Sequence, residues 1–129
     1  MILRPNYPEA LNNLGVLLRQ LGKLEDSAAC FEKLLELRPN SAEAFDNLGN
    51  TLRDLGRLEE SVASHERALR LRPDSAKAYN NLGYTQRKQG KLAESRQSFN
   101  LALALEPDSV DIRWNLCLLD LLELSLIHI

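Results

Sequence analysis

The sequence predicts an all-α fold, a solenoid of stacked antiparallel helix pairs, and three observations support that prediction. The tripeptide Asn-Leu-Gly occurs at residues 13–15, 47–49 and 81–83, at a constant step of 34 residues. Apolar residues inside each unit recur at helical spacing. Glycine and proline recur between these segments, where they end helices. A period of this length is typical of arrays in which each repeat buries its apolar face against its neighbours.

The first helix of each unit is expected at residues 8–21, 42–55 and 76–89. In the second of these segments Ala44, Leu48 and Leu52 recur at a spacing that places them on one helical face. Gly56 follows, and glycine adopts the left-handed conformation of a helix C-terminus at little energetic cost. The first helix is therefore expected to end at this glycine and at its equivalents, Gly22 and Gly90.

The second helix of the middle unit is expected at residues 58–71, because Pro73 disfavours helix in the residue before it. Ser75 then offers a side-chain oxygen to cap the next first helix. Since only two or three residues separate the helices of a unit, the two must pack antiparallel. Gly49 and its equivalents in the other units are expected where helices approach closely.

Composition places the chain among ordinary globular proteins, with 129 residues, 44% hydrophobic and 26% charged. The formal net charge is −2 and no segment is densely basic, which argues against a nucleic-acid partner. Cys30 and Cys117 are too few for a disulfide framework and are expected to be reduced core residues. The sequence has neither a signal-peptide pattern nor a membrane-spanning apolar run, so we expect a cytoplasmic protein without membrane contact.

Recurring columns of large, small, aromatic, alanine and proline residues resemble the tetratricopeptide repeat. In the third unit these are Tyr79, Leu82, Gly83, Ser95, Phe99, Ala102 and Pro107. The resemblance implies a right-handed solenoid with repeats at residues 8–41, 42–75 and 76–109, followed by the first helix of a fourth repeat at 110–123. Residues 1–7 are expected to be the end of a preceding repeat, since Leu3-Arg4-Pro5-Asn6 matches the phrase at residues 37–40.

The family binds peptides and proteins on the concave face of its first helices, so the resemblance implies the same role and a partner of that kind here. An asparagine column occupies that face in every copy, at Asn13, Asn47, Asn81 and Asn115. Similar asparagines line the repeat arms of O-linked N-acetylglucosamine transferases, where they hold the backbone of an extended substrate. An amide can both donate to and accept from a peptide backbone. The alternative is that these side chains bond to a neighbouring helix and fix the stacking.

A second column, Arg19, Arg53 and Arg87, follows about one turn later, and Asn50 and Tyr84 are further candidate peptide-binding residues. The arginines could pair with carboxylates of a ligand, or they could form a solvated edge helped by Asp54 and Glu59. The family's clamp for heat-shock chaperone tails requires lysine and asparagine one turn apart. Asn12 and Val16 stand there instead, which argues against that role.

No catalytic, metal-binding or cofactor-binding constellation is present in the sequence, so we expect a binding scaffold rather than an enzyme. His65 stands in the aromatic column and is expected to be a core residue. A rival hypothesis is a fragment of a bacterial glycosyltransferase, its substrate-recruiting arm, suggested by the asparagine column and by residues 111–115. A third is a spacer that only positions other domains.

The C-terminal segment departs from the repeat pattern, because Leu124 stands where the turn glycine is expected. Residues 124–129 match the translation of a transposon end used in sequencing libraries, which suggests an adaptor-derived tail. The preceding helix is apolar nearly all round, unlike a polar terminal cap. We therefore expect self-association through residues 112–129.

Overall fold

A computed structural model describes residues 7–127 of the chain, which form seven helices and no strand. The helices are α1 (Tyr7–Gln20), α2 (Leu24–Leu37), α3 (Ala42–Asp54), α4 (Leu58–Leu71), α5 (Ala76–Lys88), α6 (Leu92–Leu105) and α7 (Val110–Ile127). The four helices whose bounds the sequence predicted within the complete repeats agree with α1, α3, α4 and α5 to within one residue at each end. Of the expected remnant of a preceding repeat at residues 1–7, residues 1–6 lie outside the described part and Tyr7 begins α1. Residues 128–129 of the expected tail also lie outside it.

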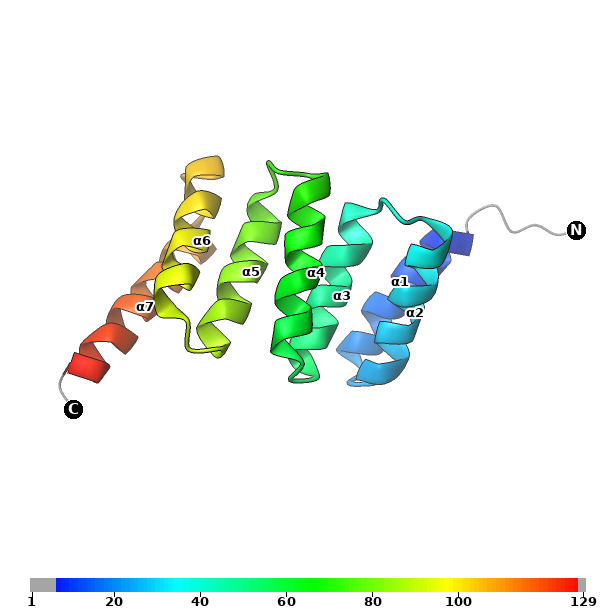
Figure 1. Cartoon of the computed structure of the whole chain (residues 1–129), viewed down its shortest axis with the longest axis horizontal. Coiled ribbons are helices and arrows are strands. Elements are labelled where there is room, and N and C mark those ends of the chain that lie inside the picture. The colour runs from blue at the N-terminus through cyan, green and yellow to red at the C-terminus, as the bar shows by residue number, and fades with distance from the viewer. Residues whose placement is uncertain (1–6, 128–129) are drawn as a thin grey trace, which may run out of the picture.

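The helix pairs follow one another along the long axis of the molecule from α1 to α7, and α2 and α4 lie in front of α1 and α3 (Figure 1). Each helix packs against the next along the chain, and α1, α3, α5 and α7 also contact one another in succession. This arrangement is a solenoid of antiparallel helix pairs, which confirms the predicted fold class. The first helices form one layer, so residues that recur in them lie side by side on one surface.

The turn inside each pair depends on a glycine in the left-handed region. Gly22, Gly56 and Gly90 have φ angles of 82°, 83° and 81°. The N–H of Arg57 donates to the carbonyl of Leu52 at 2.9 Å, which closes the end of α3. At the start of α3 the side chain of Ser41 accepts from the N–H of Ala44 at 3.1 Å, as the sequence predicted for a capping serine.

Close contact between the two helices of a pair explains why glycine recurs at residues 15, 49 and 83. A Cβ atom at Gly49 would lie 2.6 Å from the His65 ring, and one at Gly83 would lie 2.7 Å from the Phe99 ring. His65 and Phe99 are fully buried. The sequence prediction that His65 belongs to the core is therefore confirmed, and the ring at this position needs a glycine opposite it.

A hydroxyl network, which the sequence analysis missed, runs through the core between repeats. Ser61 Oγ donates to the carbonyl of Gly49 at 2.7 Å and lies 3.2 Å from Thr85 Oγ1 in the next repeat. Ser27 makes the equivalent contacts one repeat earlier, at 2.7 Å and 3.1 Å. The serine side chain in this column is therefore more than a small one, because its hydroxyl group connects a helix pair to the next pair.

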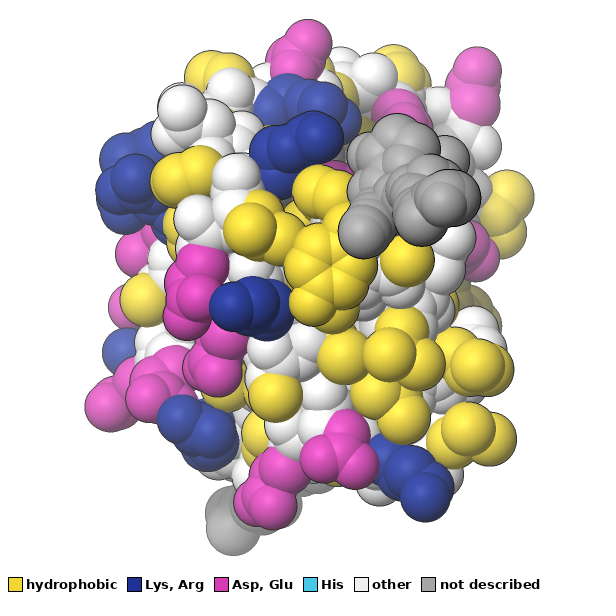
Figure 2. Space-filling view, turned by 90° about the vertical axis from the view of Figure 1, so that its right-hand side faces the viewer, with side chains coloured by type: hydrophobic (Ala, Val, Ile, Leu, Met, Phe, Trp, Pro, Cys, Tyr) yellow, Lys and Arg dark blue, Asp and Glu magenta, His cyan; other side chains and the backbone are white. Residues whose placement is uncertain are grey.

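The two ends of the array expose apolar side chains. Figure 2 looks onto the α1 and α2 end, where hydrophobic groups gather, and Leu17 and Leu21 of α1 are exposed. Helix α7 continues past the expected boundary at residue 123 as far as Ile127, since no glycine ends it. Cys30 is half-buried and Cys117 is exposed, so the expectation that both cysteines are core residues is wrong for Cys117. None of the described helices has the length and apolarity to cross a membrane.

Candidate functional site

The asparagine column links consecutive first helices. Nδ2 of Asn47 donates to Asn12 Oδ1 at 3.0 Å, and Nδ2 of Asn81 donates to Asp46 Oδ2 at 2.8 Å. The same contact recurs at 2.9 Å between α7 and α5, where Asn115 is the donor. Each bond spans 35 residues and joins a first helix to the first helix of the preceding repeat. The stacking role considered for this column is therefore present.

The carbonyl oxygens of these amides have no partner within residues 7–127. Oδ1 of Asn47, Asn81 and Asn115 accepts no hydrogen bond there, and none of the three is an enclosed unpaired atom. Each side chain is thus held in one orientation by its Nδ2 bond while its acceptor stays open to solvent. Asn13 is exposed and lines a hollow of about 810 Å³ between α1, α2 and the start of α3.

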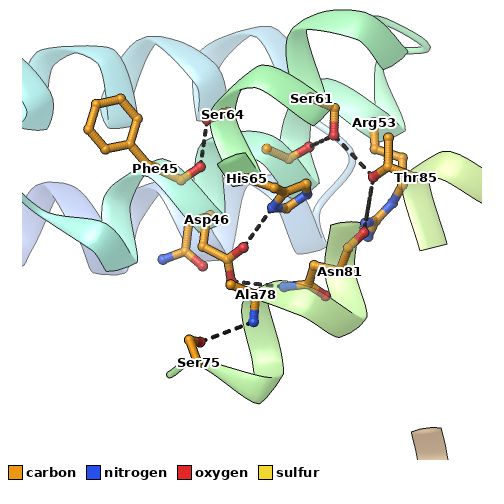
Figure 3. Close-up of polar contacts among 12 residues, drawn as sticks. Phe45, Asp46, Arg53, Ser61, Ser64, His65, Ser75, Ala78, Asn81 and Thr85 are labelled. Carbon is orange, nitrogen blue, oxygen red and sulfur yellow. Dashed lines mark hydrogen bonds and ion pairs between the residues drawn. The ribbon is translucent and has the colours of Figure 1, made fainter. Parts of the chain in front are cut away.

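One member of this interface is a carboxylate with a second buried partner. Oδ1 of Asp46 lies 2.6 Å from Nδ1 of His65, while its Oδ2 receives the Asn81 amide, as Figure 3 shows. Asp46 was not singled out by the sequence analysis. The signal was available, because Asp46 interrupts a column of asparagines and His65 a column of phenylalanines, both in the same repeat.

The three arginines of the second column have different surroundings. Arg19 is partly exposed and its Nε lies 2.6 Å from Asp54 Oδ2, which fits the expected edge ion pair. Arg53 departs from that expectation, since its exposure is only 7%. Its Nη1 lies 3.4 Å from Thr85 Oγ1 and 3.5 Å from the carbonyl of Asn81, both on α5 (Figure 3).

Tyr84 gathers three cationic side chains around its ring. The guanidinium carbons of Arg53 and Arg87 lie 4.4 Å and 4.6 Å from the ring centroid, and the Lys88 ammonium lies 5.4 Å from it. Such contacts hold a cation against the electron-rich ring face. None of the three cations forms an ion pair with a carboxylate within residues 7–127.

Several polar atoms of this region are enclosed without a hydrogen-bond partner. They include Nε of Arg53, Nη1 of Arg87 and Oδ1 of Asn50, whose side chain is 8% exposed. Burial lowers the pKa of Arg53 from the usual guanidinium value; the charge of Arg19 acts in the same direction, and that of Asp54 opposes it. The cluster therefore holds three cations with no carboxylate of residues 7–127 at ion-pair distance, while Asp54 acts on Arg53 only from further away.

Six of the nine predicted site residues fall into two neighbouring groups. A hollow of about 280 Å³ brings together Arg19, Asn47 and Asn50 from α1 and α3, and the side chain of Lys77 from α5 also lines it. The second group contains Arg53, Tyr84 and Arg87, the residues of the cationic cluster on α3 and α5. Asn13, Asn81 and Asn115 belong to neither group, and the side chain of Asn81 bonds to Asp46.

Comparison with known families agrees with the repeat geometry. Models described as "Tetratricopeptide repeat" match residues 8–41, 30–63 and 76–109, and one described as "TPR repeat" matches residues 49–90. The chain belongs to the tetratricopeptide repeat family. No curated protein matches this tetratricopeptide repeat chain in sequence.

Solved structures with the same fold include three tetratricopeptide repeat proteins. The first TPR of Spaghetti (RPAP3), bound to the HSP90 peptide SRMEEVD, has 19% identity and a TM-score of 0.84, covering 92% of this chain and 94% of that one. The first TPR domain of human RPAP3 has 20% identity and a TM-score of 0.89, covering 95% and 96%. MamA from Desulfovibrio magneticus RS-1 has 25% identity and a TM-score of 0.82, covering 92% and 67%.

Proposed function

We propose that this tetratricopeptide repeat chain is a scaffold that binds an extended segment of a partner protein along the face formed by its first helices. The observation that carries the proposal is the row of amide oxygens on Asn47, Asn81 and Asn115, each fixed by a stacking bond and each without a protein partner in the described residues. An open carbonyl oxygen can accept a backbone N–H regardless of the ligand's sequence.

Preorganisation favours this role. Because the Nδ2 bond already restricts each side chain, a ligand that uses Oδ1 loses little additional side-chain entropy on binding. A solved neighbour of the same fold is bound to a peptide, which supports peptide binding as the general activity. That neighbour is only 19% identical, and Asn12 and Val16 replace the pair expected for chaperone tails, so its HSP90 ligand is not carried over.

The glycosyltransferase alternative gains no support from the family models or from the three solved structures, which are all tetratricopeptide repeat proteins. It is not proposed further. The spacer hypothesis is the alternative that an experiment can distinguish from peptide binding, because it assigns the asparagine column to stacking alone. If the chain binds a peptide through these asparagines, replacing one of them lowers the affinity for the peptide. If the chain is a spacer, the replacement changes only stability.

A pair of substitutions separates binding from stacking. Peptides are first selected from a random display library on the wild-type chain. Asn47→Ala removes both the stacking donor and the free Oδ1, whereas Asn12→Ala removes the acceptor of the same stacking bond and leaves Asn47 Oδ1 in place. We expect similar losses of stability in both variants, of about 1 kcal/mol, and a loss of affinity of about fivefold in Asn47→Ala. Asn12→Ala should lose less affinity, because it keeps Oδ1 and removes only the bond that restricts it.

Fluorescence anisotropy of a selected peptide and urea denaturation followed by circular dichroism measure the two effects. Equal affinity of the two variants for the peptide would assign the column to stacking and contradict the proposed contact. Failure of the library to yield any peptide would contradict the proposed function itself.

A further inference from the structure

Within residues 7–127, the three cations around Tyr84 form no ion pair with a carboxylate, in contrast to Arg19 of the first repeat. Arg19 pairs with Asp54, which lies 35 residues further along the chain. The residue 35 positions after Arg53 is Lys88, whose ammonium contacts the Tyr84 ring beside the Arg53 guanidinium. The position that neutralises the first arginine therefore adds a positive charge next to the second.

From this cluster we infer that the peptide-binding face selects an acidic segment and seats a glutamate or aspartate side chain against Arg53, Arg87 and Lys88, beside the ring of Tyr84. The inference rests on the proposed peptide-binding function and names its ligand class. It uses residues separate from the asparagine column, since the cluster belongs to the carboxyl-terminal part of α3 and α5.

The burial of Arg53 strengthens its attraction to an anionic ligand. Arg53 is 7% exposed, so its charge has lost most of its hydration, while its Nε has no hydrogen-bond partner. A buried charge without a counter-ion is unfavourable, and a carboxylate that approaches it offsets this cost. Electrostatic attraction is also stronger at such a partly dehydrated site than in bulk water.

The geometry of the cluster favours a carboxylate on a side chain. The planar guanidinium matches the two oxygens of a carboxylate, and stacking on Tyr84 holds Arg53 and Arg87 in place before a ligand arrives. At their opposite ends α1, α3 and α7 carry Glu9, Glu43 and Asp111 in the first turn, whereas the first turn of α5 has no acidic residue. We therefore expect the ligand's acidic residue to be preferred at one end of the binding face and disfavoured at the other.

The test uses a peptide selected on the wild-type chain, synthesised with an acetylated N-terminus and an amidated C-terminus. Its acidic residue is changed to glutamine, and both peptides are titrated against the wild type, Arg87→Gln and Arg70→Gln. Arg87 is chosen because its side chain is less buried than that of Arg53, so the variant retains the fold. Arg70, exposed on α4, is the matched control.

We expect the glutamate-to-glutamine change in the peptide to weaken binding by about tenfold on the wild type and on Arg70→Gln, and to have little effect on Arg87→Gln. Selected peptides without an acidic preference would overturn the inference, as would an equal loss on all three proteins. In either case peptide binding through Asn47 can still be intact, so the two failures are distinguishable.

Two further arms identify the source of the anion. If only peptides with a free C-terminus bind in an Arg87-dependent way, the ligand group is a terminal carboxylate and the side-chain assignment is wrong. If phosphoserine in place of the acidic residue binds more tightly by tenfold or more, the cluster prefers phosphate and the assignment is again wrong. Similar or weaker binding of the phosphoserine peptide agrees with a carboxylate seat.

Discussion

Nδ1 of His65 lies 2.6 Å from Oδ1 of Asp46, and the ring and the carboxylate are both buried. At this distance the two atoms are hydrogen-bond partners, and the tautomer of the ring decides which of them donates. The other carboxylate oxygen of Asp46 receives the Asn81 amide of the next repeat. The pair therefore connects the core of the middle repeat to the layer of first helices that carries the candidate binding face.

His65→Phe is expected to destabilise the protein although phenylalanine occupies the same position in the neighbouring repeats, as Phe31 and Phe99. The ring would still fit against Gly49, but Asp46 would lose a hydrogen bond inside the protein. Leaving a buried acceptor unsatisfied costs about 1–3 kcal/mol. Urea denaturation followed by circular dichroism measures this loss.

Adding Asp46→Asn to His65→Phe should restore most of that stability, because the double variant recreates the Asn80 and Phe99 combination of the third repeat. The amide can accept from Asn81 through its oxygen and no longer buries a charge. If His65→Phe alone were as stable as the wild type, the His65 hydrogen bond would make no net contribution to the free energy of unfolding.

Gly83→Ala is expected to destabilise the third repeat by about 1–3 kcal/mol, since a Cβ there would lie 2.7 Å from the fully buried Phe99 ring. Gly90→Asn is the control: its φ of 81° suits asparagine better than other side chains, and nothing lies within 4 Å of its Cβ position. Thermal denaturation should show a clearly larger loss for Gly83→Ala. Gly83 lies inside α5 and has no positive φ, so a loss no larger than that of Gly90→Asn would contradict the predicted clash with Phe99.

Local signals explain why the sequence predicted the helices so closely. Turn glycines such as Gly56, the proline that follows α4 and the capping Ser75 each act on their own neighbours in the chain, so no tertiary information was needed to place α3, α4 and α5. The stacking of repeats followed from the constant period.

The candidate site was only partly predictable, because it depends on how adjacent repeats are oriented. The asparagine column was read from its period, but its partners lie 35 residues earlier and are fixed by the orientation of one first helix against the next. The burial of Arg53 and its contact with Tyr84 follow from the same packing. Only the change from Asp54 to Lys88 in one column was visible beforehand as a sign of unbalanced charge.

Helix α7 retains an exposed apolar surface that bears on association. Trp114, Leu121 and Leu124 are 63%, 61% and 52% exposed. The helix is held to α6 by Arg96, which pairs with Asp120 at 2.8 Å and Glu123 at 2.6 Å. Contiguous exposed apolar side chains on a folded helix favour contact with another apolar surface.

We expect the 129-residue chain to self-associate through this surface, with a mass by light scattering that rises with concentration. Leu121→Lys combined with Leu124→Lys should keep the protein monomeric, because each buried leucine contributes about 1.5–3 kcal/mol to such a contact. Leu101→Lys, at an exposed leucine of α6, is the matched control and should leave the association unchanged. A wild-type chain that stays monomeric at high concentration would contradict this prediction. So would dissociation caused by Leu17→Lys alone, since that residue lies at the α1 end of the array.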